Sequence, residues 1–320
     1  MYRIGVDLGG TNIAVGLVNE KYEIVARDSI PTRAERSAEE IIVDMAAVCK
    51  KLIADAGVDI SEIISVGIAA PGAANTETGY VEYANNLHFT NTPVADMLKK
   101  HLPIEKVYVA NDANTAAWGE AIAGAAKGTS NSVMITLGTG VGGGIIIDNK
   151  IYSGFNMMGG ELGHIVIEHN GRPCSCGRRG CWEAYSSATA LVKMTEEKLE
   201  ECKKNGRKTL MTELVAERGK VTGRTACDAM RRGDEAAKEV YDMYISYLAC
   251  GITNIINIFQ PEVVSIGGGI SNEGQSLIDA IFPTVSEERY GGHAVPEQTE
   301  IRIAELKNDA GIIGAAVLGV

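Results

Sequence analysis

Residues 2–11, with the sequence YRIGVDLGGT, and residues 132–144, with the sequence SVMITLGTGVGGG, decide the fold. Each stretch begins with an apolar run typical of a buried strand and then enters a glycine-rich turn. A second apolar run follows each turn, at residues 13–18 and 145–147. Two copies of strand, glycine turn and strand indicate a duplicated domain. The sequence therefore predicts an α/β protein built from two related halves.

The rest of the chain continues this alternation of strands and helices. Ser37 is a good N-cap and Glu40 follows three residues later, which forms a capping box and predicts a helix start. Residues 73–92 are rich in Asn and Thr, and we expect a polar loop there. We expect further strands at residues 23–30, 63–69, 106–110, 262–266 and 301–306. We expect helices at residues 37–57, 93–101, 113–126 and 310–318, and a long helical block within residues 183–259.

The charge and the hydropathy pattern exclude several classes of protein. The formal net charge is −11 over 320 residues. This acidic balance argues against nucleic acid as the main partner, because phosphate contacts need clustered Lys and Arg. Met1 leads directly into an apolar strand without a basic leader, and no apolar run approaches the roughly 18 residues of a membrane span. We therefore expect a cytoplasmic protein that has no membrane partner.

The cysteines fall into two groups. Their number, seven, argues against a secreted disulfide framework, which would use an even set in a shorter chain. Four lie in helix-like segments, and we expect them to be small buried hydrophobic residues: Cys49, Cys202, Cys227 and Cys250. The other three lie within eight residues of one another and follow a histidine: His164, Cys174, Cys176 and Cys181.

One imidazole and three thiolates form a Cys₃His set, which is typical of closed structural zinc sites. Unrelated cysteines and a redox pair are the alternatives, although Cys-x-Cys is not the usual redox spacing of Cys-x-x-Cys. Glu161 and Glu183 flank this cluster and could present carboxylates to sugar hydroxyls. Paired carboxylates also occur in glycosidases, but a glycosidase does not need nucleotide-type glycine turns.

The glycine turns indicate binding of an anionic ligand. Glycines let a ligand approach the backbone closely, and consecutive N–H groups in such a turn form an anion-binding nest. In the first turn, Asp7 is a candidate for holding hydrated Mg²⁺ and Thr11 offers a hydroxyl to a phosphate. A simple hairpin with a Gly-Gly turn is the alternative for this segment alone.

Two further glycine clusters favour the functional interpretation. The five glycines within residues 138–144 weaken a hairpin, so binding should offset their cost. A third cluster, Gly267-Gly268-Gly269, follows a buried strand at a place where a base or ribose could lie against the backbone. None of the three matches the P-loop or the dinucleotide fingerprint. Together they predict a nucleotide held between two duplicated domains.

Asn111 and Asp112 stand where a strand gives way to an alanine-rich helix. Asp112 is therefore a candidate general base that accepts the proton of an attacking hydroxyl during phosphoryl transfer. The alternative is structural, because a carboxylate near a helix N-terminus is stabilised there and can act as an N-cap. We expect the domain boundary at this strand-to-helix junction.

These motifs together resemble the repressor–open-reading-frame–kinase (ROK) family, and within it the bacterial glucokinases, over essentially the whole chain. The first glycine turn resembles the first phosphate motif of the family and the second turn resembles its second phosphate motif. Gly267-Gly268-Gly269 is similar to the adenosine-side motif. Glu161-Leu162-Gly163-His164 and the three clustered cysteines resemble the zinc signature, which is the family's most specific mark.

The resemblance implies a fold and a domain organisation. The fold is the two-domain, actin-like and hexokinase-type ATPase fold, which consists of duplicated ribonuclease H-like domains. Residues 1–111 would form the smaller α/β domain, with the C-terminal segment 303–320 packing back against it. Residues 112–302 would form the larger domain, which carries the zinc loop. Family relatives are commonly homodimers or homotetramers.

The resemblance also implies roles for individual residues, with ATP, Mg²⁺ and structural Zn²⁺ as cofactors. Asp112 is the implied catalytic base, and His164, Cys174, Cys176 and Cys181 are the implied zinc ligands. The implied sugar contacts are Gly72, Asn86, Asn111, Asp112, Glu161, His164 and Glu183. The implied nucleotide and phosphate contacts are Asp7, Gly9, Gly10, Thr11, Gly138, Thr139, Gly140, Gly267, Gly268 and Gly269.

The resemblance leaves several functions to compare. Repressors of this family carry a DNA-binding domain before the first phosphate motif, and here only six residues precede Asp7. We therefore expect a kinase that phosphorylates glucose at its 6-hydroxyl. The alternatives are a kinase for N-acetylmannosamine, fructose or allose, because a few hydrogen bonds decide specificity, and a non-catalytic sugar sensor of the same fold.

Overall fold

The structure is a computed structural model that describes residues 1–295 and 297–320. It contains two compact units. Unit 1 consists of Met1–Met134, Gly143–Gly160 and Ala304–Val320, and unit 2 consists of Ile135–Gly142 and Glu161–Ile303. Each unit is described separately below. The predicted domain boundary between residues 111 and 112 stays a prediction.

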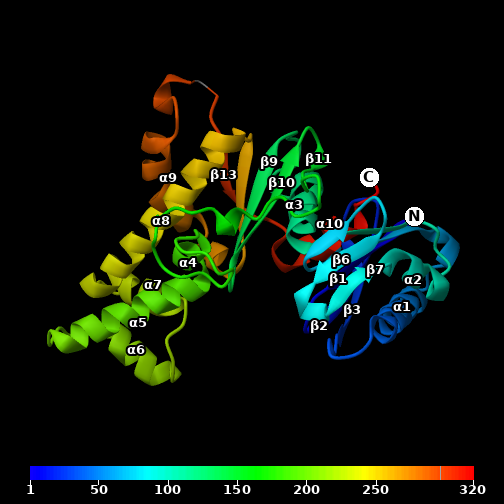
Figure 1. Cartoon of the computed structure of the whole chain (residues 1–320), viewed down its shortest axis with the longest axis horizontal. Helices are drawn as coiled ribbons and strands as arrows, with labels where there is room; N and C mark the ends of the chain where they lie inside the picture. The colour runs from blue at the N-terminus through cyan, green and yellow to red at the C-terminus, as the bar shows by residue number, and fades with distance from the viewer. Residues whose placement is uncertain (296) are drawn as a thin grey trace. The chain divides into compact units, whose positions relative to one another are not determined.

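The first sheet, whose strands β1, β2 and β3 are labelled in Figure 1, lies in unit 1 and has the strand order β3-β2-β1-β4-β8. Its strands are β1 (Tyr2–Leu8), β2 (Asn12–Val18), β3 (Ile24–Pro31), β4 (Ile63–Ala70) and β8 (Val107–Asn111). The first three strands form an antiparallel meander, whereas β1, β4 and β8 run parallel to one another. The parallel strands therefore end at the same edge of the sheet.

The second sheet repeats this topology, with the order β11-β10-β9-β12-β13. Its strands are β9 (Ser132–Leu137), β10 (Val141–Ile147), β11 (Lys150–Ile151), β12 (Val263–Gly267) and β13 (Glu300–Ile303). In both sheets the third, second, first, fourth and fifth strands follow one another in space. The shared order confirms the duplication that the paired glycine turns predicted.

Helices cover both faces of the first sheet. Ile4, Val6 and Leu8 belong to the same buried core as residues of helix α1 (Ala38–Asp55), while α2 (Val94–His101) packs beside α1. Gly5 points to the other face, as alternation along a strand requires, and there it meets α10 (Ala310–Ala316). The capping box of Ser37 and Glu40 is present at the start of α1, as predicted.

Helix α10 packs directly on the backbone of β1 and β4. A Cβ atom on Gly5 would overlap the carbonyl oxygen of Ile312, and one on Gly67 would overlap that of Ala315. Gly314 makes an equally close approach to Thr115 in α3 (Asp112–Ala123). Glycines on the sheet and on the helix therefore fix how near α10 lies to β1, β4 and α3.

A buried glutamate holds the chain where it returns to unit 1. Glu120 of α3 has a side chain with no exposed surface. Its carboxylate accepts hydrogen bonds from the backbone N–H groups of Ala125, Glu305 and Leu306, at 2.7, 3.1 and 2.8 Å. A buried carboxylate needs such partners, and here they tie α3 to the segment that leads into α10.

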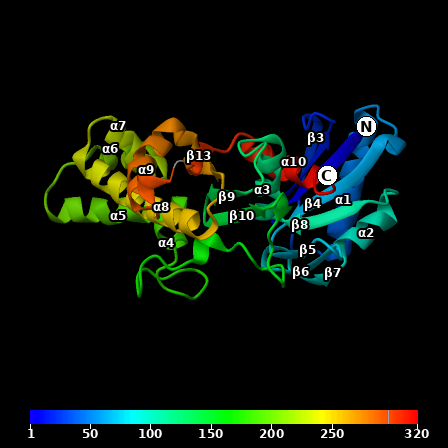
Figure 2. The same cartoon turned by 90° about the horizontal axis from the view of Figure 1, so that it is seen from above.

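The helices of unit 2 are α4 (Glu183–Ser186), α5 (Ala188–Lys204), α6 (Leu210–Arg218), α7 (Arg224–Arg231), α8 (Glu235–Phe259) and α9 (Gln275–Glu288). Figure 2 shows α5, α6, α7 and α8 as one cluster. The expected long helical block within residues 183–259 is thus a series of separate helices. Short polar connections that contain Gly206, Gly219 and Gly233, each with positive φ, interrupt it.

Two sequence predictions were wrong. Residues 73–92 were expected to be a loop, but they form a small antiparallel sheet of β5 (Ala73–Asn75), β6 (Tyr80–Ala84) and β7 (Phe89–Thr92). The few apolar residues that define it, Val81 and Phe89, are buried in the core of unit 1, and their alternation is hidden among Asn and Thr. Among the helical cysteines, Cys250 is only partly buried, whereas Cys49, Cys202 and Cys227 are buried as expected.

Within the described part of the chain, none of the helices is both long and apolar enough to cross a membrane.

The close contact between α10 and the sheet predicts that one added methyl group greatly lowers the free energy of unfolding. In Gly67→Ala the new methyl meets the Ala315 carbonyl, so α10 must move away from β4, and we expect a loss of at least about 3 kcal/mol in the free energy of unfolding. Gly128→Ala is the control, because its Cβ meets nothing within 4 Å and only its positive φ costs about 1 kcal/mol. Urea unfolding measures both variants, and equal losses would contradict the close packing.

Candidate active site

Parallel pairing in unit 1 brings three of the predicted site segments to one edge of the first sheet. Asp7 pairs with Ala69 between β1 and β4, and Ala70 pairs with Asn111 between β4 and β8. Asp7, the turn that contains Gly72, and Asn111 with Asp112 all follow from the carboxyl ends of these strands. Ligands of open α/β sheets bind at such an edge.

Asn111, and not Asp112, is the N-cap of helix α3. The Asn111 Oδ1 accepts a hydrogen bond from the Asn114 N–H at 3.1 Å, and its Nδ2 donates to the Gly72 carbonyl at 3.0 Å. Asp112 is the first helical residue; its Oδ1 accepts from the adjacent Ala113 N–H at 2.8 Å, and the Asn111 side chain also hydrogen-bonds its carboxylate. The alternative that Asp112 serves as the N-cap is therefore wrong, and its carboxylate keeps acceptor sites for a ligand.

The two carboxyl groups at this edge influence each other. Burial raises the pKa of Asp7 above the usual aspartate value, and repulsion from the nearby Asp112 raises it further. Asp112 reaches solvent, yet desolvation by the surrounding protein also raises its pKa. Carboxylates close to each other with raised pKa values favour a cation or a proton between them.

A residue that no sequence motif marks supports the first glycine turn through hydrogen bonds. Thr32 is fully buried at the end of β3, its hydroxyl donates to the Gly9 carbonyl at 2.6 Å, and its N–H donates to the Thr11 carbonyl at 2.8 Å. A Cβ on Gly10 would lie 3.2 Å from the Asn86 Cβ. The turn therefore lies beside Asn86, while the Asn85 Oδ1 accepts from the Tyr83 hydroxyl instead.

The second and third glycine clusters lie against each other in unit 2. Gly268 has a φ of +83°, and a Cβ there would come within 2.5 Å of the Leu137 backbone, so the third cluster packs behind the second turn. Gly138 and Thr139 of that turn accept hydrogen bonds through their carbonyls from the Ala188 N–H and the Thr189 hydroxyl, at 2.8 and 2.7 Å. The start of α5 thus supports the turn.

A pocket of about 540 Å³ lies next to the third cluster, also within unit 2. Its lining includes Gly269, Thr222 and Arg224, and its size is that of a small-molecule site. Asp228 braces one wall through ion pairs with Arg218 and Arg231, at 2.7 and 2.9 Å. These residues come from α6 and α7, far from the glycines in sequence, and no local motif marks them.

The four predicted metal ligands converge in unit 2. The ligand atoms of His164, Cys174, Cys176 and Cys181 all lie within 4.8 Å of one another. The His164 Nδ1 is 3.6 Å from the Cys174 Sγ, and the Cys176 and Cys181 Sγ atoms are 3.6 Å apart. A tetrahedral zinc ion needs edges of about 3.6 Å between nitrogen and sulfur and about 3.8 Å between sulfurs. The donor types and these two distances therefore fit zinc.

The cysteine loop is connected to two predicted sugar contacts. The His164 Nδ1 faces the thiols, and its Nε2 lies 3.9 Å from the Glu161 Oε2 on the other side of the ring. The Glu183 Oε2 accepts from the Val141 N–H at 3.0 Å, and its Oε1 accepts from the Ser175 hydroxyl at 3.2 Å. Glu183 therefore links the second glycine turn to the cysteine loop.

The site residues are thus divided between the units. Within unit 1 the structure brings together Asp7, Gly9, Gly10, Thr11, Gly72, Asn86, Asn111 and Asp112. Within unit 2 it brings the turn at Gly138, Thr139 and Gly140 close to Gly268 and Glu183, and gathers Glu161 and His164 at the cysteine loop. The individual ligand contacts stay predictions.

Comparison with known proteins identifies the family and the fold of the chain. The model of the ROK family matches residues 3–319, and the chain belongs to the ROK family. It therefore has the actin-like, hexokinase-type ATPase fold, as the sequence motifs predicted.

Several named relatives of the chain are glucokinases. The chain is 36% identical over 319 residues to a glucokinase from Halalkalibacterium halodurans, covering 98% of this chain and 94% of the relative. It is 37% identical over 320 residues to a glucokinase from Thermotoga maritima, covering 98% and 95% of the two chains. A crystal structure of a ROK family glucokinase from Streptomyces griseus, in complex with glucose and AMPPNP, aligns with a TM-score of 0.79 at 33% identity, over 99% of each chain.

The geometry of the thiol cluster predicts its metal content. We expect purified wild-type protein to contain close to one zinc ion per chain and Cys176→Ser to lose most of it, because a serine hydroxyl replaces a thiolate ligand. Cys202→Ser, in a buried position of α5, is the control and should keep its zinc. Metal analysis by mass spectrometry measures all three proteins. Equal zinc content in the two variants would rule out the cluster as the zinc site.

Proposed function

We propose that this chain transfers the γ-phosphoryl group of ATP to the 6-hydroxyl of glucose, with Asp112 as the general base. The observation that carries the proposal is the state of Asp112. It begins a helix without capping it, so its carboxylate remains available for a substrate hydroxyl. Whole-chain similarity to named glucokinases supports glucose and ATP as the substrates.

The glucose O6–H proton passes to the Asp112 carboxylate while O6 attacks the γ-phosphorus. The new O6–P bond forms as the bond from the γ-phosphorus to the bridging β,γ-oxygen breaks, and ADP leaves with that electron pair. A carboxyl group whose pKa is raised by desolvation accepts this proton more readily than an ordinary aspartate, although it must be ionised at the start.

The proposal assigns the phosphates to the two glycine turns. Gly10 and Thr11 offer backbone N–H groups and a hydroxyl from unit 1, and Thr139 and Gly140 do so from unit 2. Gly9 and Gly138 donate their own N–H groups to the carbonyls of Asn12 and Gly140, and without side chains they leave room for a phosphate to approach. The pocket beside Gly269 suits the adenosine. Mg²⁺ bound with ATP supplies positive charge to the phosphates, and Asp7, whose carboxyl lies near that of Asp112, suits the role of holding it.

The zinc ion has a positioning role in this proposal. A metal on the His164 Nδ1 leaves the proton on Nε2, which makes a fixed N–H donor beside Glu161. Donor and carboxylate together would hold sugar hydroxyls, with Asn86, Asn111, Glu183 and the Gly72 backbone completing the set. A cytoplasmic location is also part of the proposal, and family membership supports a homodimer or homotetramer.

Asp112→Asn tests the general base. We expect kcat for glucose to fall roughly 10²- to 10⁴-fold, because the amide cannot accept the proton. Glucose and ATP should still bind, since Asn111 caps the helix in the variant as well. A coupled assay gives kcat, calorimetry gives the affinities, and N-acetylmannosamine, fructose and allose serve as alternative hexoses.

The control for this test is Asp96→Asn, which changes an exposed aspartate in the first turn of α2 and should leave kcat unchanged. A near-normal kcat in Asp112→Asn would remove Asp112 from the mechanism. Faster turnover of another hexose than of glucose by the wild type would overturn the proposed specificity.

Gly138→Val tests the phosphate turn separately from the fold. A Cβ on Gly138 meets no protein atom within 4 Å, and the residue does not have a positive φ, so the variant should fold normally. The isopropyl group should block the approach of phosphate to the backbone, and we expect the KM for ATP to rise about tenfold or more while glucose affinity holds. An unchanged KM for ATP with unaltered thermal stability would mean that the turn is only structural.

A further inference from the structure

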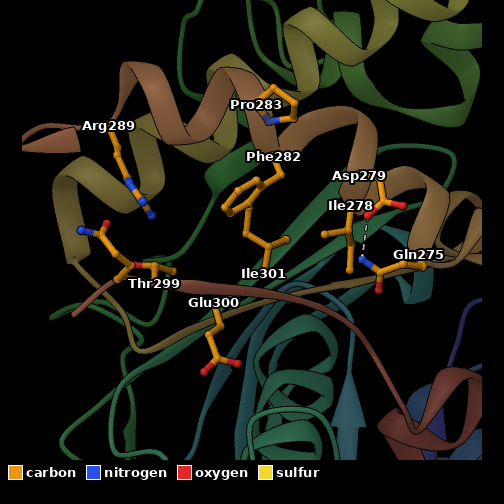
Figure 3. Close-up of a pocket in the computed structure, with 10 residues that line it drawn as sticks. Gln275, Ile278, Asp279, Phe282, Pro283, Arg289, Thr299, Glu300 and Ile301 are labelled. Atoms are coloured by element: carbon orange, nitrogen blue, oxygen red, sulfur yellow. Dashed lines mark hydrogen bonds between the residues drawn. The ribbon is translucent and has the colours of Figure 1, made fainter. Parts of the chain in front are cut away.

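A second pocket in unit 2 lies between α9 and β13, and none of the residues proposed for sugar, nucleotide or zinc lines it (Figure 3). Its volume is about 570 Å³, which is enough for a small organic molecule. Its walls are mainly apolar, with Ile278, Phe282 and Pro283 on the helix and Ile301 on the strand. Phe282 and Ile301 point toward each other in Figure 3.

Arg289 closes one end of this pocket and is 93% buried, with a relative exposure of 7%. Its side chain runs from the end of α9 toward β13 (Figure 3). Its Nε atom is buried without a hydrogen-bond partner, and among residues 1–295 and 297–320 no acidic group forms an ion pair with its guanidinium. A guanidinium stays charged at any physiological pH, so the site holds a largely buried cation whose Nε–H lacks an acceptor among the described residues.

The polar groups near Arg289 form hydrogen bonds with other partners. The Gln298 amide nitrogen donates to the carbonyls of Gly292 and Val295, and the Thr299 hydroxyl donates to the Pro261 carbonyl at 2.7 Å. The Glu300 carboxylate accepts from Arg302 at 2.7 Å. The C-terminus of α9 favours a positive charge, but a helix dipole stabilises a cation less than burial of an unpaired charge costs. The protein therefore leaves the guanidinium short of an acceptor.

The opposite end of the pocket carries the opposite charge. There Asp279 accepts a hydrogen bond from the Gln275 side chain at 2.9 Å. Asp279 and Arg289 are ten residues apart, which corresponds to about 15 Å along the helix. An anion is attracted by one end and repelled by the other, with an apolar stretch between them. The pocket thus selects both the charge and the orientation of a ligand.

We propose that this pocket binds an amphipathic organic anion. A carboxylate or phosphate head accepts hydrogen bonds from Arg289, and an alkyl or aryl body covers Ile278, Phe282 and Ile301. A planar guanidinium suits either head, because both offer two oxygens to its fork of N–H groups. Such a ligand supplies the missing acceptor and removes apolar surface from water in one step. The site is separate from the proposed kinase chemistry and does not depend on it.

Octanoate is the probe for this site, and octanamide is its uncharged counterpart of the same shape. Binding to the wild-type protein is measured by calorimetry and by the side-chain Nε–H signal of arginine in nitrogen-15 spectra. We expect octanoate to bind at least about tenfold more tightly than octanamide, as for a hydrogen bond to a charged group, and to shift one arginine Nε–H signal. Octyl phosphate tests the other head, and binding by either anion supports the proposal.

The variant Arg289→Met tests whether Arg289 binds the anion. Arg302→Met, on the neighbouring strand, is the matched control. We expect the affinity of Arg289→Met for octanoate to be about tenfold or more lower than that of the wild type, because the charged hydrogen-bond donor is gone. Without ligand, the melting temperature of Arg289→Met should be no lower than that of the wild type, because the variant lacks an unpaired buried charge. Arg302→Met should bind octanoate as the wild type does. The proposal is overturned if neither octanoate nor octyl phosphate binds the wild type more tightly than octanamide, or if ligand-free Arg289→Met has a lower melting temperature than the wild type.

Discussion

Parallel pairing of β1 with β4, and of β4 with β8, is the constraint on which the proposed chemistry depends. Because the three strands are in register, Asp7 and the Asn111–Asp112 pair leave the sheet at the same edge. Glycines let α10 pack at backbone distance against β1 and β4, on the opposite face from α1. Desolvation raises the pKa values of both carboxyl groups, and the convergence adds to the raised pKa of Asp7 through repulsion from Asp112.

In unit 2 a side-chain carboxylate, and not strand pairing, connects the segments of the site. Glu183 accepts hydrogen bonds from the Val141 N–H at the second glycine turn and from Ser175 in the cysteine loop. One carboxylate thereby connects the segment proposed for phosphate with the loop whose donors fit zinc. The second ring nitrogen of His164, Nε2, lies 3.9 Å from the Glu161 Oε2. Loss of the metal should therefore affect orientation of the sugar-side groups before it affects chemistry.

Local signals in the sequence predicted much of this arrangement. Glycine turns, the capping box at Ser37 and the spacing of the cysteines are short-range patterns, and the structure has them where they were expected. The small sheet of β5, β6 and β7 was missed because its core depends on a few distant apolar contacts. Thr32 and Arg224 were missed because only the fold brings them beside Gly9 and Gly269.

Phosphorus-31 spectra of the wild-type enzyme with ATP, Mg²⁺ and glucose test the proposed phosphoryl transfer. We expect the γ-phosphate signal of ATP to disappear while signals of ADP and glucose 6-phosphate grow in equal amounts, and we expect no change when glucose is omitted. Persistence of the ATP signals in a protein that binds glucose would contradict it, as would release of inorganic phosphate in place of the sugar phosphate.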